Sequence, residues 1–332
     1  MKIEKNTVVV VTGGSAGIGR AVACEFARCG AKVAVLARES DRLEQTRREL
    51  AALGVRALAV AADVADAGQV DAAAERIEQE LGPIATWVNN AMVTVVAPVA
   101  DMQAGAFQRV SDVTYLGPVW CTMAALKRMR PRNRGTIVQV GSALAYRAIP
   151  LQSAYCGAKH AIRGFTESLR TELLHDGSKV QVTLVELPGV NTPQFDWCKT
   201  TLANSPQPVG RVYQPELVAR AIVWAAQSGR REIYPTLSAA MAIWGDKLAP
   251  GLLDRYLSHA AWEGQTSTEP VRPDRGDNLF TPGKLPAGAR GRFDAIARSR
   301  STSLWFNRHR TPLLLGALAL IGLGRKGRGS RR

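Results

Sequence analysis

The chain has 332 residues, of which 46% are hydrophobic and 21% are charged, and its formal net charge at pH 7 is +15. A chain of this length and apolar content can bury a large core, which excludes an intrinsically disordered protein, a collagen-like fibre and a small disulfide-stabilised domain. Residues 284–332 hold 12 basic residues and one acidic residue, whereas residues 1–283 hold 31 basic and 27 acidic residues, so the charge belongs to a tail and specific nucleic-acid binding is not expected.

Residues 1–235 alternate short β-branched runs with longer helical patterns. A first strand is predicted over residues 8–11 and a first helix over residues 18–29. Further strands are predicted over residues 32–36, 57–61, 86–88, 136–140, 180–185 and 232–234, and further helices over residues 40–53, 70–81, 110–129, 154–174 and 215–227. This alternation predicts an α/β fold, a Rossmann-type doubly wound parallel sheet with helices on both faces.

The pattern changes after residue 235. Residues 239–262 are predicted to form one or two short helices. Residues 264–291 are rich in Gly, Pro and charge and have no periodic apolar face, which indicates a mobile or surface-wrapping segment rather than a second domain. We therefore expect a nucleotide-binding catalytic domain over residues 1–240, an extension over residues 241–303 and a tail over residues 304–332.

A glycine-rich turn separates the first strand from the first helix. It contains Thr12, Gly13, Ser15, Gly17, Ile18 and Gly19 in the spacing Gly-x3-Gly-x-Gly. Glycines let a backbone approach a pyrophosphate closely, and the N-terminus of the following helix attracts its negative charge. An ordinary turn would use the same residues, but the position between a strand and a helix favours dinucleotide binding.

The ends of the second and third strands are expected to meet the adenosine half of a dinucleotide. The second ends in Ala37 and Arg38, where an acidic residue would select NAD. A guanidinium suits a 2′-phosphate, so NADP is favoured over NAD unless Arg38 is only a solvated loop residue. The third ends in Asp63 and Val64. The Asp63 carboxylate suits the adenine amine, although it would equally cap the next helix.

Three side chains suit proton transfer. Tyr155 and Lys159 are four residues apart on one predicted helix and therefore share a face, while Ser142 ends the preceding strand at the ligand-binding edge of the sheet. A neighbouring ammonium and a positive nicotinamide ring are expected to lower the pKa of Tyr155. Tyr155 would then exchange a proton with a carbonyl or alcohol oxygen that Ser142 holds. Taken alone, the Tyr-x3-Lys pair would equally fit a solvated helix face.

Jointly these residues resemble the short-chain dehydrogenase/reductase family. The match runs over residues 6–234 and includes the glycine turn, Asp63, Asn89-Asn90-Ala91, Ser142, Tyr155-x3-Lys159 and Pro188-Gly189-x2-Thr192. The resemblance implies an NAD(P)-dependent oxidoreductase acting on CH–OH or C=O groups, with Tyr155 as general acid/base, Ser142 polarising the carbonyl and Lys159 holding the nicotinamide ribose. It also implies a homodimer or homotetramer and further cofactor contacts at Asn90, Pro188, Gly189, Val190 and Thr192.

Two residues depart from the family pattern. Met92 replaces the glycine of Asn-Asn-Ala-Gly, and its thioether would narrow the cofactor cleft or wall the substrate. Thr114 replaces an asparagine that is thought in the family to anchor a water relaying protons to the lysine. A threonine hydroxyl can hold a water but cannot copy the contacts of an amide. Thr114 is therefore kept as the fourth candidate catalytic residue, with the proton relay in doubt.

The segments expected to wall the substrate pocket are mostly apolar. They are residues 93–96, 143–150 and 193–197, with Arg147 as the single basic residue among them. Such a pocket suits a lipophilic carbonyl or alcohol, although core packing would produce the same composition. The leading interpretation is an NADP-dependent reductase or dehydrogenase, and the alternative is a non-catalytic cofactor-binding or scaffolding protein.

The ends of the chain and the cysteines bear on location. Residues 311–324 carry no charge but are too short as a helix to span a bilayer, and eight mostly basic residues follow them. An apolar stretch with a basic run favours membrane-surface association over packing on the enzyme or nonspecific nucleic-acid contact. The five cysteines show no metal-binding spacing and no secretory signal precedes the first strand. We expect a metal-free cytoplasmic protein whose C-terminal tail associates with a membrane surface.

Overall fold

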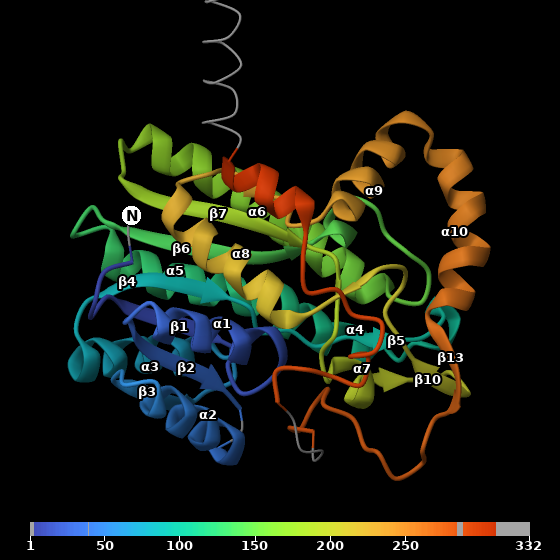
Figure 1. The fold of residues 1–332 in the computed structure, drawn as a ribbon, viewed down its shortest axis with the longest axis horizontal. Helices are drawn as coiled ribbons and strands as arrows, with labels where there is room; N and C mark the ends of the chain where they lie inside the picture. Colours follow the sequence, from blue (N-terminus) through green and yellow to red (C-terminus); the bar gives the residue numbers. More distant parts are fainter. Residues whose placement is uncertain (1–2, 39, 284–287, 310–332) are drawn as a thin grey trace, which may run out of the picture.

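The computed structural model describes residues 3–38, 40–283 and 288–309. Within this part of the chain, seven parallel strands form the central sheet (Figure 1). In spatial order they are β12 (Glu232–Ile233), β7 (Val180–Leu187), β6 (Gly135–Ser142), β4 (Ile84–Asn89), β1 (Val8–Thr12), β2 (Lys32–Ala37) and β3 (Ala57–Ala61). The strand order reverses between β1 and β4, which is the point where doubly wound sheets bind ligands. The predicted fold class is confirmed.

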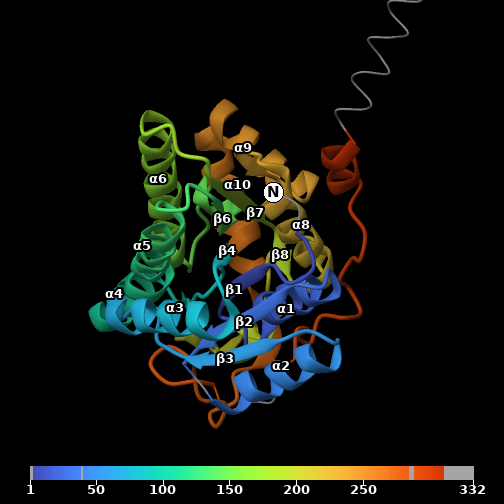
Figure 2. The same cartoon turned by 90° about the vertical axis from the view of Figure 1, so that its left-hand side faces the viewer.

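Helices cover both faces of this sheet, as Figure 2 shows. One face carries α3 (Ala67–Leu81), α4 (Ala104–Ser111), α5 (Gly117–Met129) and α6 (Ser153–His175), and the other carries α1 (Gly17–Arg28), α2 (Ser40–Ala52) and α8 (Pro215–Ser228). Successive strand residues alternate between the two cores. Val8 and Val10 pack in the first core, and Val9 and Val11 pack in the second. Because both faces are covered, the strands read as continuous apolar runs.

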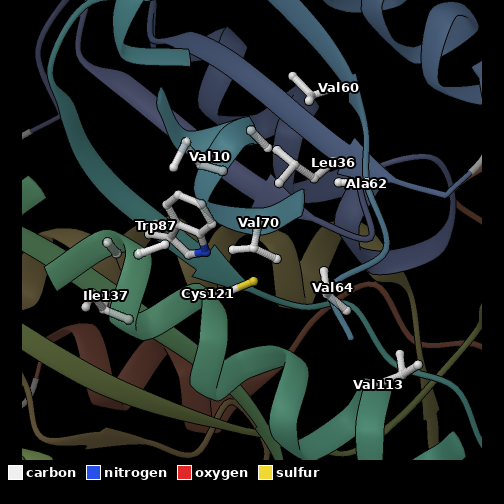
Figure 3. Packing of buried hydrophobic residues seen from close by; sticks show 14 of the residues in the cluster. Val10, Leu36, Val60, Ala62, Val64, Val70, Trp87, Val113, Cys121 and Ile137 are labelled. Atoms are coloured by element: carbon white, nitrogen blue, oxygen red, sulfur yellow. The ribbon is translucent and has the colours of Figure 1, made fainter. Parts of the chain in front are cut away.

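The first core is centred on a tryptophan of β4. Trp87 has no exposed surface (Figure 3). It lies among Val10 and Ile137 of the flanking strands β1 and β6 and Val70 and Cys121 of the covering helices α3 and α5. The indole Nε1 donates to the Asn89 side chain at 2.9 Å, so its single polar group is satisfied inside the core. This packing fixes β4, whose last residues lead into the candidate cofactor site.

The predicted helix over residues 110–129 is wrong at its start and in its middle. Helix α4 begins at Ala104, and a π-helical turn, η2 (Asp112–Leu116), separates it from α5. Pro118 at the start of α5 lacks the N–H that would bond to the Thr114 carbonyl in a regular helix. A π-turn at this point is typical of functional sites and places Thr114 in the interior.

The remaining elements gather at the carboxyl ends of the strands (Figure 1). They are β5 (Val95–Val96) paired with β9 (Lys199–Thr200), β8 (Gly189–Val190) paired with β11 (Val212–Tyr213), β10 (Asn204–Pro206) paired with β13 (Thr266–Pro270), α7 (Gln194–Trp197), α9 (Leu237–Leu248), α10 (Pro250–Gly264), η1 (Val99–Asp101) and η3 (Ala143–Ala145). Two helices, α9 and α10, occupy the region where one or two were predicted. Residues 271–283 and 288–301 then wrap along the molecule, whereas the strand β13 was not predicted.

Candidate active site

The glycine-rich turn after β1 is locked onto the end of β4. The Thr12 hydroxyl accepts the backbone N–H groups of Asn90 at 2.9 Å and Ala91 at 3.0 Å, and the Asn90 side chain donates to the Thr12 carbonyl at 2.9 Å. Gly13 has φ +66°, and a Cβ there would lie 2.9 Å from the Ala91 Cα. A Cβ at Gly19 would lie 2.2 Å from the Gly13 carbonyl oxygen. Only glycine fits these positions, so the turn is a built cradle rather than an ordinary loop.

Three predicted catalytic residues converge on one side of this turn. Ser142 ends β6, and Tyr155 and Lys159 lie in the first turns of α6. The Lys159 side chain is 4% exposed, and its Nζ donates to the Val140 carbonyl at 2.7 Å and lies 5.6 Å from the centre of the Tyr155 ring. The short strand–loop–helix segment therefore brings a hydroxyl, a phenol and an ammonium together.

A cavity of about 480 Å³ joins the turn to these three residues. Its lining includes Gly13, Ser15, Gly17, Ile18, Arg38, Asp63, Val64, Asn90, Ser142, Tyr155, Lys159, Pro188, Gly189, Val190 and Thr192. Thr12 and Gly19 lie behind this wall and shape it. The cavity lies at the carboxyl edge of a doubly wound sheet, has the size of a small-molecule site and begins at a glycine cradle. The residues present therefore fit a nicotinamide dinucleotide.

Comparison with known proteins identifies the fold and its chemistry. Residues 7–200 match the family model described as short chain dehydrogenase. The chain belongs to the short-chain dehydrogenase family. It is 33% identical over 321 residues to an uncharacterized oxidoreductase YxnA of Bacillus subtilis, covering 96% of this chain and 89% of that protein. It is 31% identical over 229 residues to a 3-ketodihydrosphingosine reductase of Bos taurus, covering 67% of this chain and 68% of the relative.

A solved structure agrees with this assignment. The crystal structure of a short-chain type dehydrogenase/reductase from Mycobacterium marinum superposes with a TM-score of 0.62 at 27% identity, covering 70% of this chain and 95% of that one. The predicted family and the prediction of an enzyme are confirmed. This short-chain dehydrogenase is thus an NAD(P)-dependent oxidoreductase of the short-chain dehydrogenase/reductase type.

Burial sets the pKa values of the catalytic residues of this dehydrogenase. Burial raises the pKa of the Tyr155 phenol. The hydrogen bond between the Ser142 and Tyr155 side chains opposes this shift only in part. Burial lowers the pKa of Lys159 from 10.5 to about 8, and Glu186 partly opposes this shift. Desolvation of the phenolate thus acts against the expected lowering of the Tyr155 pKa, and that expectation, which includes the charge of a nicotinamide ring, stays a prediction.

Thr114 has a different environment from the one expected. Its side chain has no exposed surface, and its hydroxyl donates to the Val93 carbonyl at 2.8 Å and accepts the Val93 N–H at 3.1 Å. The only hydroxyl proton is thus committed to the backbone of the segment that follows β4. In this dehydrogenase the threonine ties the π-turn to Val93, and Met92 beside it lines the cavity.

The Arg38 guanidinium is held by hydrogen bonds to backbone carbonyls rather than by solvent. Its Nη1 donates to the carbonyls of Leu279 and Phe280 at 3.1 Å, and its Nη2 donates to the Asn278 carbonyl at 2.6 Å. Residues 278–280 belong to the extension and come roughly 240 positions later in the chain. No local pattern around Arg38 predicts this contact. We call residues 278–280 the carbonyl clamp.

Asp63 is engaged by an arginine that the sequence did not single out. Its Oδ2 accepts from Arg109 Nη2 at 2.5 Å, and Arg109 Nε donates to the Leu279 carbonyl at 3.2 Å. Asp63 does not cap α3, because Asp66 does so by accepting the Gln69 N–H at 3.0 Å. The adenosine end of the cavity thus combines guanidinium groups with one carboxylate.

The substrate end of the cavity is mainly apolar. Of the predicted wall, the lining includes Val93, Thr94, Ala143, Leu144, Arg147, Ile149 and Phe195. Trp197 also lines the cavity but lies at the adenosine end, where the Arg42 guanidinium covers its ring at 4.9 Å. Val95 and Val96 instead pack in the interior and are wrong as wall residues. Leu253 and Leu257 of α10 complete the wall. Their four-residue spacing on an amphipathic helix was the available signal.

No helix within residues 3–38, 40–283 and 288–309 combines the length and apolarity needed to cross a membrane. The predicted anchor over residues 304–332 falls mostly on residues 310–332, which lie outside the described part of the chain. Residues 302–309 are helical, and the Asn307 side chain donates to the Tyr234 carbonyl at 3.1 Å.

Proposed function

We propose that this dehydrogenase transfers a hydride between NADP(H) and a lipophilic carbonyl or alcohol, with Tyr155 as the general acid/base. The observation that carries the proposal is the convergence of Ser142, Tyr155 and Lys159 on a cavity with an apolar far end. The bound nicotinamide would supply or accept the hydride. Lys159 would hold the nicotinamide ribose, and Pro188, Gly189, Val190 and Thr192 would contact the carboxamide.

The protein's own side chains supply the proton chemistry. Tyr155 keeps its proton at neutral pH, because burial raises its pKa. It is therefore set to act as an acid toward a carbonyl oxygen that becomes an alcohol. Ser142 Oγ, which accepts the Leu144 N–H at 3.2 Å, retains its own proton to donate to the same oxygen. Both groups favour the charge that develops on oxygen during reduction.

The charge at the adenosine end supports NADP over NAD. The end of β2 carries Arg38 and no carboxylate at residue 37 or 38, and Asp63 is paired with Arg109. Arg42 also lines this end of the cavity. Burial is the main cause that lowers the pKa of Arg38, the positive charges of Arg109 and Arg42 add to this effect, and Asp63 opposes it. A 2′-phosphate would offset these positive charges, and the carbonyl clamp would orient the guanidinium toward it.

The substrate end supports a lipophilic compound. Arg147 is the single basic residue of the wall segment over residues 143–150, and it is neutralised by Asp246 at 2.9 Å and Asp254 at 2.5 Å. Leu144, Ile149 and Leu257 present hydrocarbon to the cavity. One similar protein is named 3-ketodihydrosphingosine reductase, and that name supports the choice of a lipophilic carbonyl for the test. An alkyl ketone or alcohol is thus the best-matched class.

The test is the oxidation of NADPH by the purified chain with ketones of increasing alkyl length: acetone, 2-octanone, 2-dodecanone and 3-ketodihydrosphingosine. NADH replaces NADPH in a parallel series. We expect kcat/KM to rise with chain length and to be higher with NADPH. Tyr155→Phe should lower kcat about 1,000-fold, while Tyr256→Phe, at a tyrosine that is 66% exposed, should leave it unchanged. Turnover of acetone as efficient as that of 2-dodecanone would overturn the substrate class.

A further inference from the structure

A buried acid lies behind the catalytic residues. Glu186, in β7, has no exposed surface. Val182 of the same strand packs in the core below α6, whereas Val185 and Leu187 pack in the opposite core. Since side chains alternate along a strand, Glu186 points to the face covered by α6, which carries Tyr155 and Lys159. An ionisable side chain at such a place is rare unless it has a partner or a task.

The backbone of β6 brings this acid close to Lys159. Gly141 pairs with Glu186 across the sheet, and a Cβ at Gly141 would lie 2.3 Å from Glu186 Oε2. The carbonyl oxygen of the preceding residue, Val140, accepts a hydrogen bond from Lys159 Nζ at 2.7 Å. The glycine therefore lets the carboxyl group lie directly against the strand, one residue from the point where Lys159 is held. Within the described residues, neither oxygen of the Glu186 carboxyl group has a hydrogen-bonding partner of ordinary geometry.

The charged and titratable neighbours of Glu186 come from three elements. They are Lys159 and Tyr155 of α6, Glu232 of β12, Tyr146 after η3, and Tyr234 after β12. Burial and the Glu232 carboxylate raise the pKa of Glu186, while the Lys159 ammonium opposes them. The balance favours a protonated carboxyl at neutral pH. A buried carboxyl whose oxygens lack hydrogen-bonding partners is more stable as the neutral acid, so Glu186 can carry a proton near the catalytic lysine.

A row of polar groups leads from this carboxyl to the surface. Tyr146 Oη donates to Glu232 Oε1, and Tyr234 Oη lies 3.5 Å from Tyr146 Oη. The Arg163 guanidinium covers the Tyr146 ring at 3.9 Å. Glu232, Tyr146 and Tyr234 are all partly exposed at the edge strand of the sheet. Glu186 thus lies between Lys159 and groups that reach solvent.

We propose that Glu186 is a positioning residue that returns a proton to Lys159 and Tyr155 after each carbonyl reduction, with Glu232 and Tyr146 linking it to solvent. This inference rests on the proposed function. In reduction the Tyr155 O–H bond breaks and the product O–H bond forms. The Lys159 ammonium then gives a proton to the Tyr155 phenolate, which restores the phenol. The neutral amine of Lys159 next takes the carboxyl proton of Glu186, and Glu186 regains a proton from water through Glu232. These steps move protons only.

The position of Thr114 gives this route its importance. Its hydroxyl proton is held by the Val93 carbonyl, so the threonine offers no free donor in place of the asparagine that it replaces. Glu186 approaches the same lysine from β7, on the neighbouring strand. The chain thus lacks the asparagine but carries a buried acid near Lys159.

The test compares the first turnover with steady turnover in Glu186→Gln, which keeps the shape of the side chain and removes its acid. Rapid mixing with NADPH and 2-dodecanone should give a first turnover within about twofold of wild type, since Tyr155 starts protonated. Steady-state kcat should fall about tenfold or more with KM little changed. The proposal is overturned if Glu186→Gln matches wild type in both the first turnover and the steady state. It is also overturned if the variant loses the same factor in both phases, because a merely structural role predicts that result.

Two further variants and one spectrum complete the test. Glu172→Gln removes an exposed acid of α6 and should match wild type. Tyr146→Phe keeps the ring under Arg163, removes the donor to Glu232, and should lower steady-state kcat about threefold. The infrared C=O band of a protonated carboxyl at neutral pH should be present in wild type and missing in Glu186→Gln. If wild type lacks that band, the relay is overturned, whether or not a ketone is reduced. If the band is present but no ketone is reduced, the result counts against the proposed function and not against the protonated carboxyl.

Discussion

The two ends of the cofactor cavity are built in different ways. At the catalytic end, Ser142, Tyr155 and Lys159 come from one continuous strand–loop–helix segment. At the adenosine end, Arg38 meets the carbonyl clamp, and Asp63 meets Arg109, across gaps of 46 to 242 residues. A site within one segment inherits its geometry from the spacing of its residues. A site closed by distant segments depends on the completed fold.

The largest expected effect is at the catalytic end. Tyr155→Phe removes the only hydroxyl of that side chain and should lower kcat about 1,000-fold, since a general acid contributes about 10²- to 10⁴-fold. The dissociation constant of NADPH, measured by quenching of tryptophan fluorescence, should stay within about twofold of wild type. Equal losses in cofactor binding and in turnover would show that the two ends are not separable.

The next effect separates the cofactors at the adenosine end. Arg38→Ala removes a charged hydrogen-bonding group and should weaken NADPH binding about 10- to 100-fold while changing NADH binding little. Calorimetric titration with both cofactors measures the difference. Arg48→Ala, at a side chain that is 75% exposed on α2, is the matched control. If NADH and NADPH lose affinity alike, Arg38 serves only the carbonyl clamp and NADP selectivity lies elsewhere.

A smaller effect is expected from pH at the catalytic end. Lys159 loses its proton above about pH 8, so kcat for reduction should be about tenfold lower at pH 9 than at pH 7. The unfolded chain keeps this proton up to pH 10.5. Taken alone, Lys159 therefore makes the folded state gain stability as pH rises from about 8 to 10.5. The measurement is kcat and the dissociation constant of NADPH between pH 7 and pH 9. A fall in kcat while the dissociation constant stays unchanged would place the effect at the catalytic end.

The smallest effect tests the link between the π-turn and the cavity wall. Thr114→Val removes both hydrogen bonds to Val93 and should lower the free energy of unfolding by about 1 kcal/mol or somewhat more, because the Val93 groups lose their partner. Thr114→Ser keeps the hydroxyl and should lose less. Urea unfolding followed by circular dichroism measures both variants. A larger loss in Thr114→Ser than in Thr114→Val would contradict this role.

Much of this arrangement was predictable, for physical reasons that differ between residues. The strands were predicted because parallel strands buried on both faces read as apolar runs, and the glycine turn because only glycine fits at Gly13 and Gly19. The start of α4 was missed because Ala104 and the residues after it form too short an apolar pattern before the π-turn.

The contacts of Arg38 and the role of Arg109 were not predictable, because their partners lie in a segment without periodicity. Glu186 did leave a signal, namely one acid near the end of the apolar run of β7. That signal gains meaning only when the sheet register places Gly141 beside it. Local spacing therefore predicts chemistry within a segment, and register and distant contacts supply the rest.

The carbonyl clamp also has a consequence for synthesis. Arg38 leaves the ribosome 241 residues before Leu279, which at about 5–20 residues per second is a delay of about 12–48 s. During that interval the glycine turn and β2 can pair while the guanidinium still lacks its clamp. The nascent enzyme therefore completes its adenosine site only after Leu279 has been added, and a cofactor that binds there stabilises a chain that already contains the carbonyl clamp.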